Sequence, residues 1–331
     1  MQQKGLRELG WRFYPLATSQ VTRMDAMQKY DAIVVGGSFA GLSAAMQLAR
    51  ARRRLLLIDS GRPRNRFAAA SHGFLGQDGA APTEIMREGL TQLARYSSVD
   101  FVRAEAVYAS KDEDRIAVML SDGTQMSAAK IVLATGVADD PPLASMTPRW
   151  GVSVLHCPYC HGYEVQGRRI AAIANTPAAV HQAVILPDWG PTTFFTQGAF
   201  EPTEEDAAFL AARGVEIERT PVVELLGEGS AIEALRLADG RMVAAEVVFT
   251  SSRTSMASPL AEQLGCAFIQ GMTGPHIVVD PMQQTSVPGV FAAGDAATAM
   301  YNATLASAAG VIAGVSAHRA LVLDDAVGVR P

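Results

Sequence analysis

The chain is short of cysteine and of charged residues, and each shortage excludes a class of protein. Three cysteines in 331 residues are too few for a secreted disulfide scaffold. Charged residues make up 18% of the chain and the formal net charge is −5, so there is no surplus of Lys and Arg to neutralise nucleic-acid phosphates. We identify neither a run of ~20 apolar residues nor the apolar core of a signal peptide. We therefore expect a cytoplasmic protein with no nucleic-acid partner and no membrane partner.

Apolar residues, in contrast, make up 49% of the chain, which is long enough for about two folded domains. One basic cluster, at residues 50–54, falls where the first expected helix ends, and it predicts a solvated helix terminus rather than a phosphate site. We divide the chain into an N-terminal extension, a first domain in two parts and a second domain inserted into the first: 1–28, then 29–140 with 253–331, and 141–252.

The first domain opens with a strand, a glycine-rich turn and a helix. Continuous apolar residues at 31–35 and 55–59 predict two parallel strands, with a helix at 42–49 between them. The turn between strand and helix matches the dinucleotide-binding fingerprint, except that a serine replaces its middle glycine. An acidic residue ends the second strand, where it can accept hydrogen bonds from a ribose. The candidate cofactor-binding residues here are Gly36, Gly37, Ser38, Phe39, Ala40, Gly41 and Asp59.

The same pattern recurs in the second domain, with a strand at 169–174, a helix at 178–186 and a strand at 192–196. Alternating segments at 116–120 and 234–237, each followed by an Asp-Gly turn, predict hairpins attached to the sheets. A last helix is expected at 303–323. The predicted fold class is therefore α/β, with two Rossmann-like (three-layer ββα) dinucleotide-binding domains, the second inserted into the first.

Two cysteines lie in the second domain at a spacing that closes a small disulfide, Cys157-Pro158-Tyr159-Cys160. Histidines flank the pair, as His156 and His161. Three other interpretations stay open: a c-type haem attachment site, a Cys₂His₂ zinc site and a structural disulfide. Haem attachment requires export, the neighbouring His and Cys side chains do not easily converge on one tetrahedral ion, and a reducing cytosol disfavours a structural disulfide. We expect no metal ion, and we interpret the third cysteine, Cys266, as a buried apolar residue.

Two further segments, 130–136 and 285–295, each predict a buried strand that ends in a turn of small residues. With the first turn and the cysteine pair, they make residues 29–323 similar to the low-molecular-weight thioredoxin reductase family of FAD disulfide oxidoreductases. This resemblance implies FAD as cofactor and a homodimer. It also implies that a loop at residues 65–75, containing His72, runs close to the flavin. The cofactor-binding residues that it adds are Asn65, Arg66, Thr135, Gly136, Gly294, Asp295, Asn302, Ala303 and Thr304.

The resemblance also implies roles for the cysteines: Cys160 faces the flavin and Cys157 exchanges with the substrate. Thioredoxin reductases usually carry an acid after the second cysteine, whereas this chain has His161. The form His-Cys-Pro-Tyr-Cys-His is more similar to the gliotoxin- and holomycin-type dithiol oxidase branch. There, a histidine would accept the proton of a substrate thiol at neutral pH.

The second domain lacks the glycines that a pyridine nucleotide requires. Residues 174–179 read Ala-Asn-Thr-Pro-Ala-Ala where a Gly-x-Gly pattern is expected, and no pair of arginines follows the next strand. NADPH binding is therefore doubtful, although a divergent loop that still binds it stays an alternative. We expect an enzyme that oxidises a small-molecule dithiol to a disulfide with O₂ as acceptor. The alternatives are a thioredoxin reductase-like enzyme reduced by NADPH or ferredoxin, with a thioredoxin-like protein as partner, and a flavin-bound redox sensor without turnover.

Overall fold

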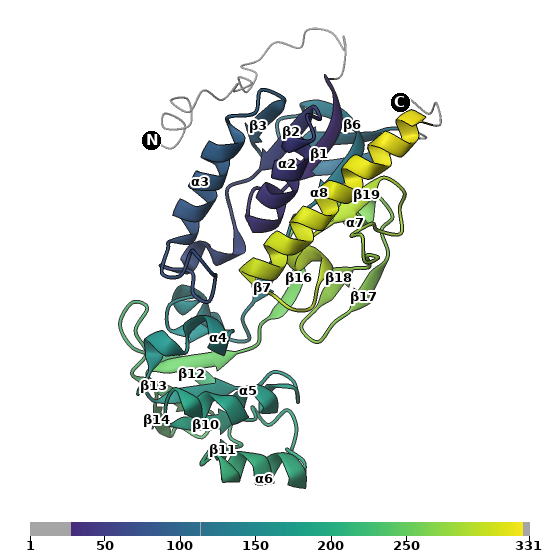
Figure 1. The fold of residues 1–331 in the computed structure, drawn as a ribbon. Coiled ribbons are helices and arrows are strands. Elements are labelled where there is room, and N and C mark those ends of the chain that lie inside the picture. Colours follow the sequence, from purple (N-terminus) through teal and green to yellow (C-terminus); the bar gives the residue numbers. More distant parts are fainter. Residues whose placement is uncertain (1–27, 113, 327–331) are drawn as a thin grey trace. The chain divides into compact units, whose positions relative to one another are not determined.

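The computed structural model describes residues 28–112 and 114–326, which form two compact units (Figure 1). The first unit contains the described residues of Met1–Arg64, Thr83–Ala138 and Ser255–Pro331, and the second contains Asn65–Pro82 and Asp139–Thr254. The expected N-terminal extension, 1–28, lies outside the described residues except for its last residue. The sequence-based division placed residues 65–82 in the first domain. That assignment is corrected, because this loop makes its contacts with the second unit: Phe67 packs at Gly151.

The first unit is built on a mixed sheet with the strand order β3-β2-β1-β6-β5-β4. β1, β2, β3 and β6 are parallel, and β4, β5 and β6 form an antiparallel meander. A seventh strand, β19, pairs in parallel with the last residues of β6. The strands are β1 (Gln28–Val35), β2 (Leu55–Asp59), β3 (Val99–Arg103), β4 (Ala106–Lys111), β5 (Ile116–Leu120), β6 (Gln125–Leu133) and β19 (Val290–Ala292).

Helices and short segments complete this unit, and the chain passes between the units in β7 (Val137–Asp140) and β16 (Arg253–Met256). The expected helix at 303–323 is α8, and the basic cluster at 50–54 begins where α2 ends, as predicted. The remaining elements are α2 (Phe39–Arg50), η1 (Arg64–Phe67), α3 (Pro82–Leu93), α7 (Leu260–Gln263), β17 (Phe268–Gln270), β18 (Pro275–Ile277), η5 (Gly294–Ala297) and α8 (Ala303–Ala326).

Both faces of the central strands are buried, which explains their uninterrupted apolar sequences. In β1, Ile33 and Val35 face one core cluster, whereas Ala32 and Val34 face the other. The second cluster includes side chains from α2 and α8. The sheet thereby fixes the carboxyl ends of β1, β2, β6 and β19 at one edge, the edge at which α/β folds bind ligands.

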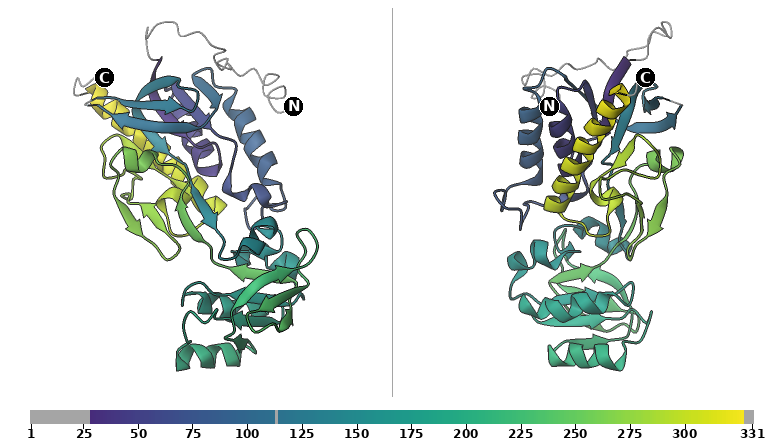
Figure 2. Two further views of the ribbon diagram at one scale, coloured as in Figure 1. Left: turned by 180° about the vertical axis from the view of Figure 1, so that it is seen from behind. Right: turned by 45° about the vertical axis from the view of Figure 1, so that its right-hand side comes forward.

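Helix α8 packs closely along α2, and Figure 2 shows the yellow helix beside the purple one. Two glycines make this approach possible, because a side chain at Gly310 would collide with the backbone of Ala40 and one at Gly314 with the backbone of Ala44. Among the described residues, Ala303–Asp324 is long and apolar enough to cross a membrane by length and composition. This corrects the expectation that no segment reaches that length. The helix is rich in small apolar residues where it packs on α2.

Replacing Gly310 by valine is expected to lower the free energy of unfolding by about 2 kcal/mol, because the added atoms overpack a helix contact that has no space for them. Urea unfolding followed by circular dichroism measures the change. Ala308→Val on the exposed side of the same helix is the control, and it should cost well under half as much. Equal losses in the two variants would mean that the α2–α8 contact does not require glycine.

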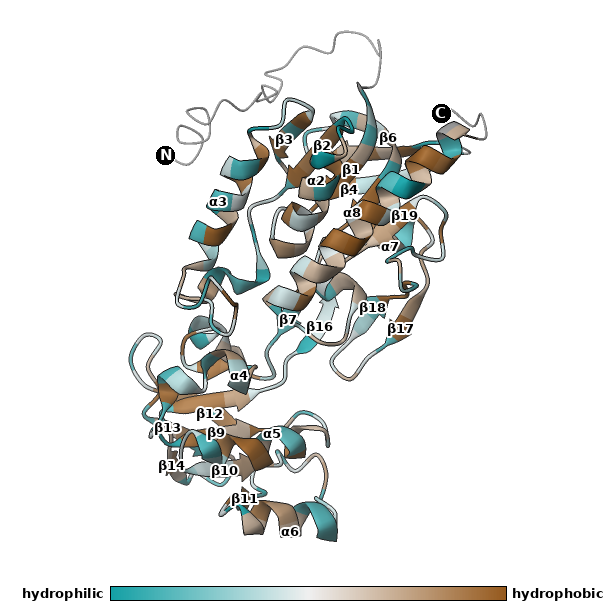
Figure 3. Cartoon of the chain, viewed as in Figure 1, coloured by the Kyte–Doolittle hydropathy of each residue, from teal (hydrophilic) through white to brown (hydrophobic). Residues whose placement is uncertain are grey.

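The second unit contains a parallel sheet with the order β11-β10-β9-β15-β8 and an antiparallel meander, β12-β13-β14. Side chains on the two faces of β9 enter two separate cores, and Figure 3 shows both hydrophobic (brown) and hydrophilic (teal) segments in this unit. Its elements are η2 (Ala144–Arg149), β8 (Val154–Leu155), α4 (Pro158–His161), η3 (Tyr163–Val165), β9 (Ile170–Ile173), α5 (Ala179–Ile185), η4 (Leu186–Asp188), β10 (Thr192–Phe195), α6 (Glu204–Ala212), β11 (Glu216–Glu218), β12 (Val222–Leu226), β13 (Ala234–Leu237), β14 (Met242–Ala244) and β15 (Val247–Thr250).

Candidate active site

The turn between β1 and α2 has the geometry that a cofactor diphosphate requires. Gly36 has φ +110°, and a side chain there would collide with the carbonyl oxygen of Ala134. Gly41 likewise lies against the backbone of Gly36. Ser38 is the N-cap residue of α2, but its side chain makes no capping hydrogen bond and the first turn contains no acidic residue. The amide groups at this helix start therefore remain available to an anion, which fits the diphosphate of FAD.

Asp59 ends β2 beside this turn, and its carboxylate is already held by two groups. Oδ1 accepts a hydrogen bond of 3.0 Å from the amide of Gly37, and Oδ2 pairs with the guanidinium of Arg103. The amide of Gly37 and the guanidinium of Arg103 thus orient this carboxylate beside the turn, and its contact with a ribose stays a prediction. Arg103 is a partner that the sequence analysis missed.

The second small-residue turn, Gly294–Asp295, lies against the first. Gly294 has φ +74°, and a Cβ there would lie 2.9 Å from the Cβ of Ala40. Asp295 accepts a hydrogen bond of 2.9 Å from Arg64, and the Arg64 guanidinium stacks 4.1 Å above the ring centroid of Tyr301. Arg64 balances the charge of the predicted cofactor-binding aspartate, and the sequence analysis did not identify it.

Five other predicted cofactor residues lie at two places, the start of α8 and the end of β6. Asn302 caps α8 with its side chain, which accepts hydrogen bonds from the amides of Thr304 (2.8 Å) and Leu305 (3.2 Å). Ala303 and Thr304 form the first turn of that helix, whereas Thr135 and Gly136 follow β6 at the ligand-binding edge. An asparagine that precedes an alanine-rich segment is a capping signal, so this role was readable from the sequence.

Asn65 and Arg66 begin the loop that belongs to the second unit. Arg66 stacks its guanidinium 4.2 Å from the ring centroid of Phe67. The side-chain oxygen of Asn65 is buried without a hydrogen-bond partner among the described residues. Their predicted contact with the cofactor stays a prediction.

The two cysteines are joined in a disulfide, with their Cα atoms 5.2 Å apart. Cys157 is the N-cap residue of the one-turn helix α4, and Pro158 occupies its first position. A side chain at Gly162 would collide with the ring of Trp189, so α4 lies directly on the residue that follows η4. This packing fixes the disulfide in the second unit.

His161 ends α4, next to Cys160, and its Nδ1 atom is buried without a hydrogen-bond partner among the described residues. Burial lowers the pKa of His161 below its ordinary value, the charge of Glu164 raises it, and His72 lowers it further. The net effect favours a neutral imidazole at neutral pH, which is the form that accepts a proton. His156, the other flanking histidine, stacks on Trp150 with ring centroids 6.1 Å apart.

The loop at residues 174–179 offers little to a nucleotide diphosphate. Ala174 is buried, and the Asn175 side chain donates to the carbonyl oxygen of Ser251. The amides of Ala179 and Val180 are already hydrogen-bonded to the carbonyl groups of Thr176 and Pro177, at 3.1 and 3.2 Å. α5 has only seven residues. The helix start is therefore short, and its first amides are engaged within the turn.

The arginines that follow this region also have partners. Arg213 pairs with Asp188, and Arg219 contacts both carboxylate oxygens of Glu201. Glu201 lies in the segment after β10, where family reductases would carry arginines for a 2′-phosphate. Glu201 thus engages Arg219, whose guanidinium would otherwise be available to a phosphate dianion.

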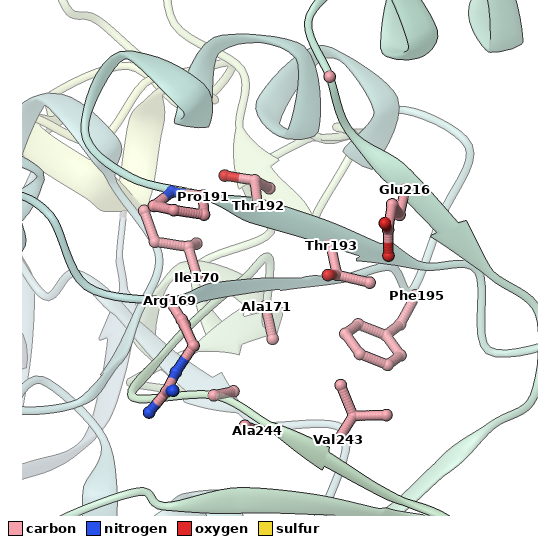
Figure 4. A pocket seen from close by; sticks show the side chains of 12 residues that line it. Arg169, Ile170, Ala171, Pro191, Thr192, Thr193, Phe195, Glu216, Val243 and Ala244 are labelled. Carbon is pink, nitrogen blue, oxygen red and sulfur yellow. The ribbon is translucent and has the colours of Figure 1, made fainter.

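One recess in the second unit contains none of the predicted site residues in its lining (Figure 4). Its volume is about 260 Å³, and it is bounded by the amino ends of β9 and β10 and by β14. Ligands of parallel α/β sheets bind at the carboxyl ends of the strands, and pockets for them are typically larger, about 300 to 1,000 Å³. We assign no function to this recess.

Cys266 is buried, as predicted, and burial raises the pKa of its thiol. Within residues 28–112 and 114–326, no group of three or more His, Cys, Asp or Glu side chains is arranged to hold a metal ion.

The first unit contains the cofactor turn and the second contains the disulfide and His161, and the comparisons with known proteins match residues of both units. The model of the pyridine nucleotide-disulphide oxidoreductase family matches residues 30–174 and 201–310. The chain belongs to this family. The match omits residues 175–200, which contain α5, β10 and most of the loop that lacks glycines.

Curated relatives of this family member include thioredoxin reductase tcpT of Claviceps purpurea, 32% identical over 89% of this chain and 95% of tcpT. Thioredoxin reductase sirT of Leptosphaeria maculans is 30% identical over 86% of this chain and 92% of sirT. Similar solved structures include an oxidoreductase from Agrobacterium tumefaciens, 45% identical over 89% of this chain and 99% of that chain, with a TM-score of 0.85. HlmI is 34% identical over 94% of this chain and 97% of its own, with a TM-score of 0.83.

These findings confirm the resemblance to thioredoxin reductase-like flavoproteins and the α/β fold. The chain is an FAD-dependent disulfide oxidoreductase by family. The family as a whole combines a flavin with a site of NAD(P)H type.

Proposed function

We propose that this protein oxidises a small-molecule dithiol to a disulfide with O₂ as electron acceptor and FAD as cofactor. The observation that carries the proposal is the disulfide Cys157–Cys160 beside His161, whose Nδ1 atom is buried, in a unit whose nucleotide loop has its first amides engaged. A disulfide is the oxidised state that a substrate dithiol can reduce.

The cysteine chemistry balances as two thiol-disulfide exchanges. His161 accepts the proton of the first substrate thiol, and the substrate sulfur attacks Cys157, so that a mixed disulfide forms and Cys160 leaves as the thiolate. The second substrate thiol gives its proton to the Cys160 thiolate, and its sulfur attacks the first substrate sulfur, which releases the substrate disulfide and the Cys157 thiolate. Gly36, Gly41 and Asp59 would hold FAD, which would supply the two-electron acceptor through which Cys157 and Cys160 return to the disulfide and O₂ is reduced, with two protons, to H₂O₂.

Three features support the absence of NADPH from this cycle. The engaged amides at the start of α5 leave few donors for a diphosphate, Glu201 engages the guanidinium of Arg219, and the family match omits residues 175–200. Gly36, Gly41 and Gly294, in contrast, retain the close backbone approach that FAD binding uses. Electrons therefore enter from the dithiol.

The second candidate is a thioredoxin reductase-like enzyme that NADPH or ferredoxin reduces and that acts on a thioredoxin-like protein. The names of tcpT and sirT favour it. A flavin-bound redox sensor without turnover is the third candidate, and the disulfide flanked by His156 and His161 argues against it. By family resemblance we extend the proposal to a cytoplasmic homodimer of the gliotoxin- and holomycin-type branch. Exposed apolar side chains on α8, including Leu305, Ile312, Val315 and Val322, would suit an interface.

Oxygen consumption by the purified holoprotein distinguishes the candidates. With dithiothreitol as the probe dithiol, we expect uptake of one O₂ and formation of one H₂O₂ for each dithiol oxidised, with no added nucleotide. Catalase should return half of the oxygen. Turnover that requires NADPH and a thioredoxin, with none from dithiol alone, would replace the proposal by the reductase.

A further inference from the structure

A second histidine lies beside the redox pair, although it comes from a distant part of the sequence. His72 belongs to the loop 65–82, which groups with the second unit. Its ring meets the His161 ring edge to face, with centroids 6.5 Å apart and planes at 80°. The two imidazoles thus lie together, and His161 follows Cys160 directly in the chain.

Carboxylates complete the cluster. Nδ1 of His72 lies 3.4 Å from Oε1 of Glu164 and 3.9 Å from Oδ1 of Asp78. Asp78 also accepts a hydrogen bond of 2.8 Å from the amide of Gly73, which closes the loop around His72. Glu164 follows α4 in the turn that carries His161, so its carboxylate acts on both rings.

Charge makes the members of this cluster interdependent. Two neighbouring imidazoles repel each other when both are protonated, and a carboxylate between them favours one proton on the pair. The charge of Glu164 raises the pKa of His161, and His72 lowers it.

Resting on the function proposed above, we infer that His72, Glu164 and His161 act as one proton-binding site beside the Cys157–Cys160 disulfide. Glu164 is the shared counter-ion that stabilises the imidazolium formed when His161 takes the substrate thiol proton. His72 is a positioning residue that competes for Glu164 and so promotes release of that proton.

Other groups that face His161 in the second unit do not replace these partners. Trp189, which follows η4, packs on α4, and the charge of Asp188 in η4 is paired with Arg213. The tyrosines next to it in sequence, Tyr159 and Tyr163, are largely exposed. His156 stacks on Trp150. Glu164 and His72, the latter joined by Asp78, are the groups whose charges act on His161.

Nuclear magnetic resonance of the oxidised holoprotein, labelled at histidine Cε1, measures the titration of His161 directly and without turnover. The chain has six histidines, and the His161 signal is identified by its absence from His161→Gln. We expect His72→Gln to raise the His161 midpoint by about half a pH unit, since it removes a competing positive charge. Glu164→Gln should lower it by a similar amount, since it removes the counter-ion.

The matched controls are His181→Gln and Glu228→Gln, which change exposed side chains of the same unit and should leave the midpoint unchanged. Loss of packing alone would expose His161 and raise its midpoint in both test variants, so a downward shift in Glu164→Gln is specific to the charge. Upward shifts in both, or no shift in either, would overturn the three-residue site.

The acid limb is the part of the pH profile in which kcat/KM for dithiol oxidation falls as the pH is lowered. Its position distinguishes this inference from the function on which it rests. We expect the limb to move with the His161 midpoint in each variant. If the midpoints shift in opposite directions while the limb stays fixed, the three-residue site stands as a charge cluster. In that case His161 is not the thiol proton acceptor.

Discussion

Cys160→Ser is expected to retain bound FAD and to slow dithiol-dependent flavin reduction by about 10³-fold or more. The variant keeps Cys157 as a thiol, but it has no Cys157–Cys160 disulfide for a substrate thiolate to attack, so the mixed disulfide with the substrate does not form. It also lacks the neighbouring thiol that must close the intramolecular disulfide, and intramolecular partners of this kind have very large effective concentrations. Stopped-flow absorbance of the flavin band under nitrogen gives the rate, and the intact mass of the variant should show no substrate adduct on Cys157.

Cys266→Ala is the matched control for this substitution, because Cys266 is buried and its sulfur lies 3.6 Å from Thr285 Oγ1 in a different part of the fold. We expect its rate of flavin reduction to equal that of the parent protein. Unchanged reduction in Cys160→Ser would remove the cysteine pair from the mechanism, and the account of the site would then be wrong.

His161→Gln is expected to lower kcat/KM for a dithiol about 100-fold near neutral pH, which is a typical contribution of a general base. The neutral imidazole accepts the proton, so activity is present above the His161 pKa and is lost as the pH falls through it. Because burial lowers this pKa, the parent protein should keep its activity to a lower pH than an ordinary histidine, near 6.5, would allow. Steady-state oxygen uptake between pH 5 and pH 10 measures both effects.

The loss of kcat/KM in His161→Gln should become smaller above pH ~9, because a free thiol with a pKa near 8.5 ionises there without a general base. His181→Gln provides the control for an exposed histidine of the same unit. A loss of equal size at every pH would point to damaged packing around α4 rather than to a missing proton acceptor.

Much of the fold could be predicted from local sequence patterns. The strands around Gly36 and Asp59 are uninterrupted apolar runs because both faces of the sheet are buried, and this pattern is visible in the sequence. The helix at α8 was expected within three residues of its observed end. Its capacity to span a membrane by composition was missed, because alanine and glycine at a close helix contact make a helix apolar without a long run of large side chains.

Contacts between segments that are far apart in the sequence could not be predicted from local sequence patterns. The pairing of Arg64 with Asp295 and the approach of His72 to His161 join residues with no shared periodicity, so only the folded chain reveals them. For the same reason the loop 65–82 was assigned to the wrong unit. The cysteine pair and its flanking histidine were found because their chemistry is contiguous in sequence.

We propose that the electrons enter from a dithiol and not from NADPH, and anaerobic bleaching of the flavin tests this most directly. The oxidised holoprotein is mixed under nitrogen with NADPH in one experiment and with dithiothreitol in the other, and the flavin absorbance is followed in time. We predict bleaching by the dithiol, recovery of the colour when air is admitted, and no bleaching by NADPH. Rapid bleaching by NADPH would contradict the account, because the loop at residues 174–179 would then bind the nucleotide and the protein would be a reductase.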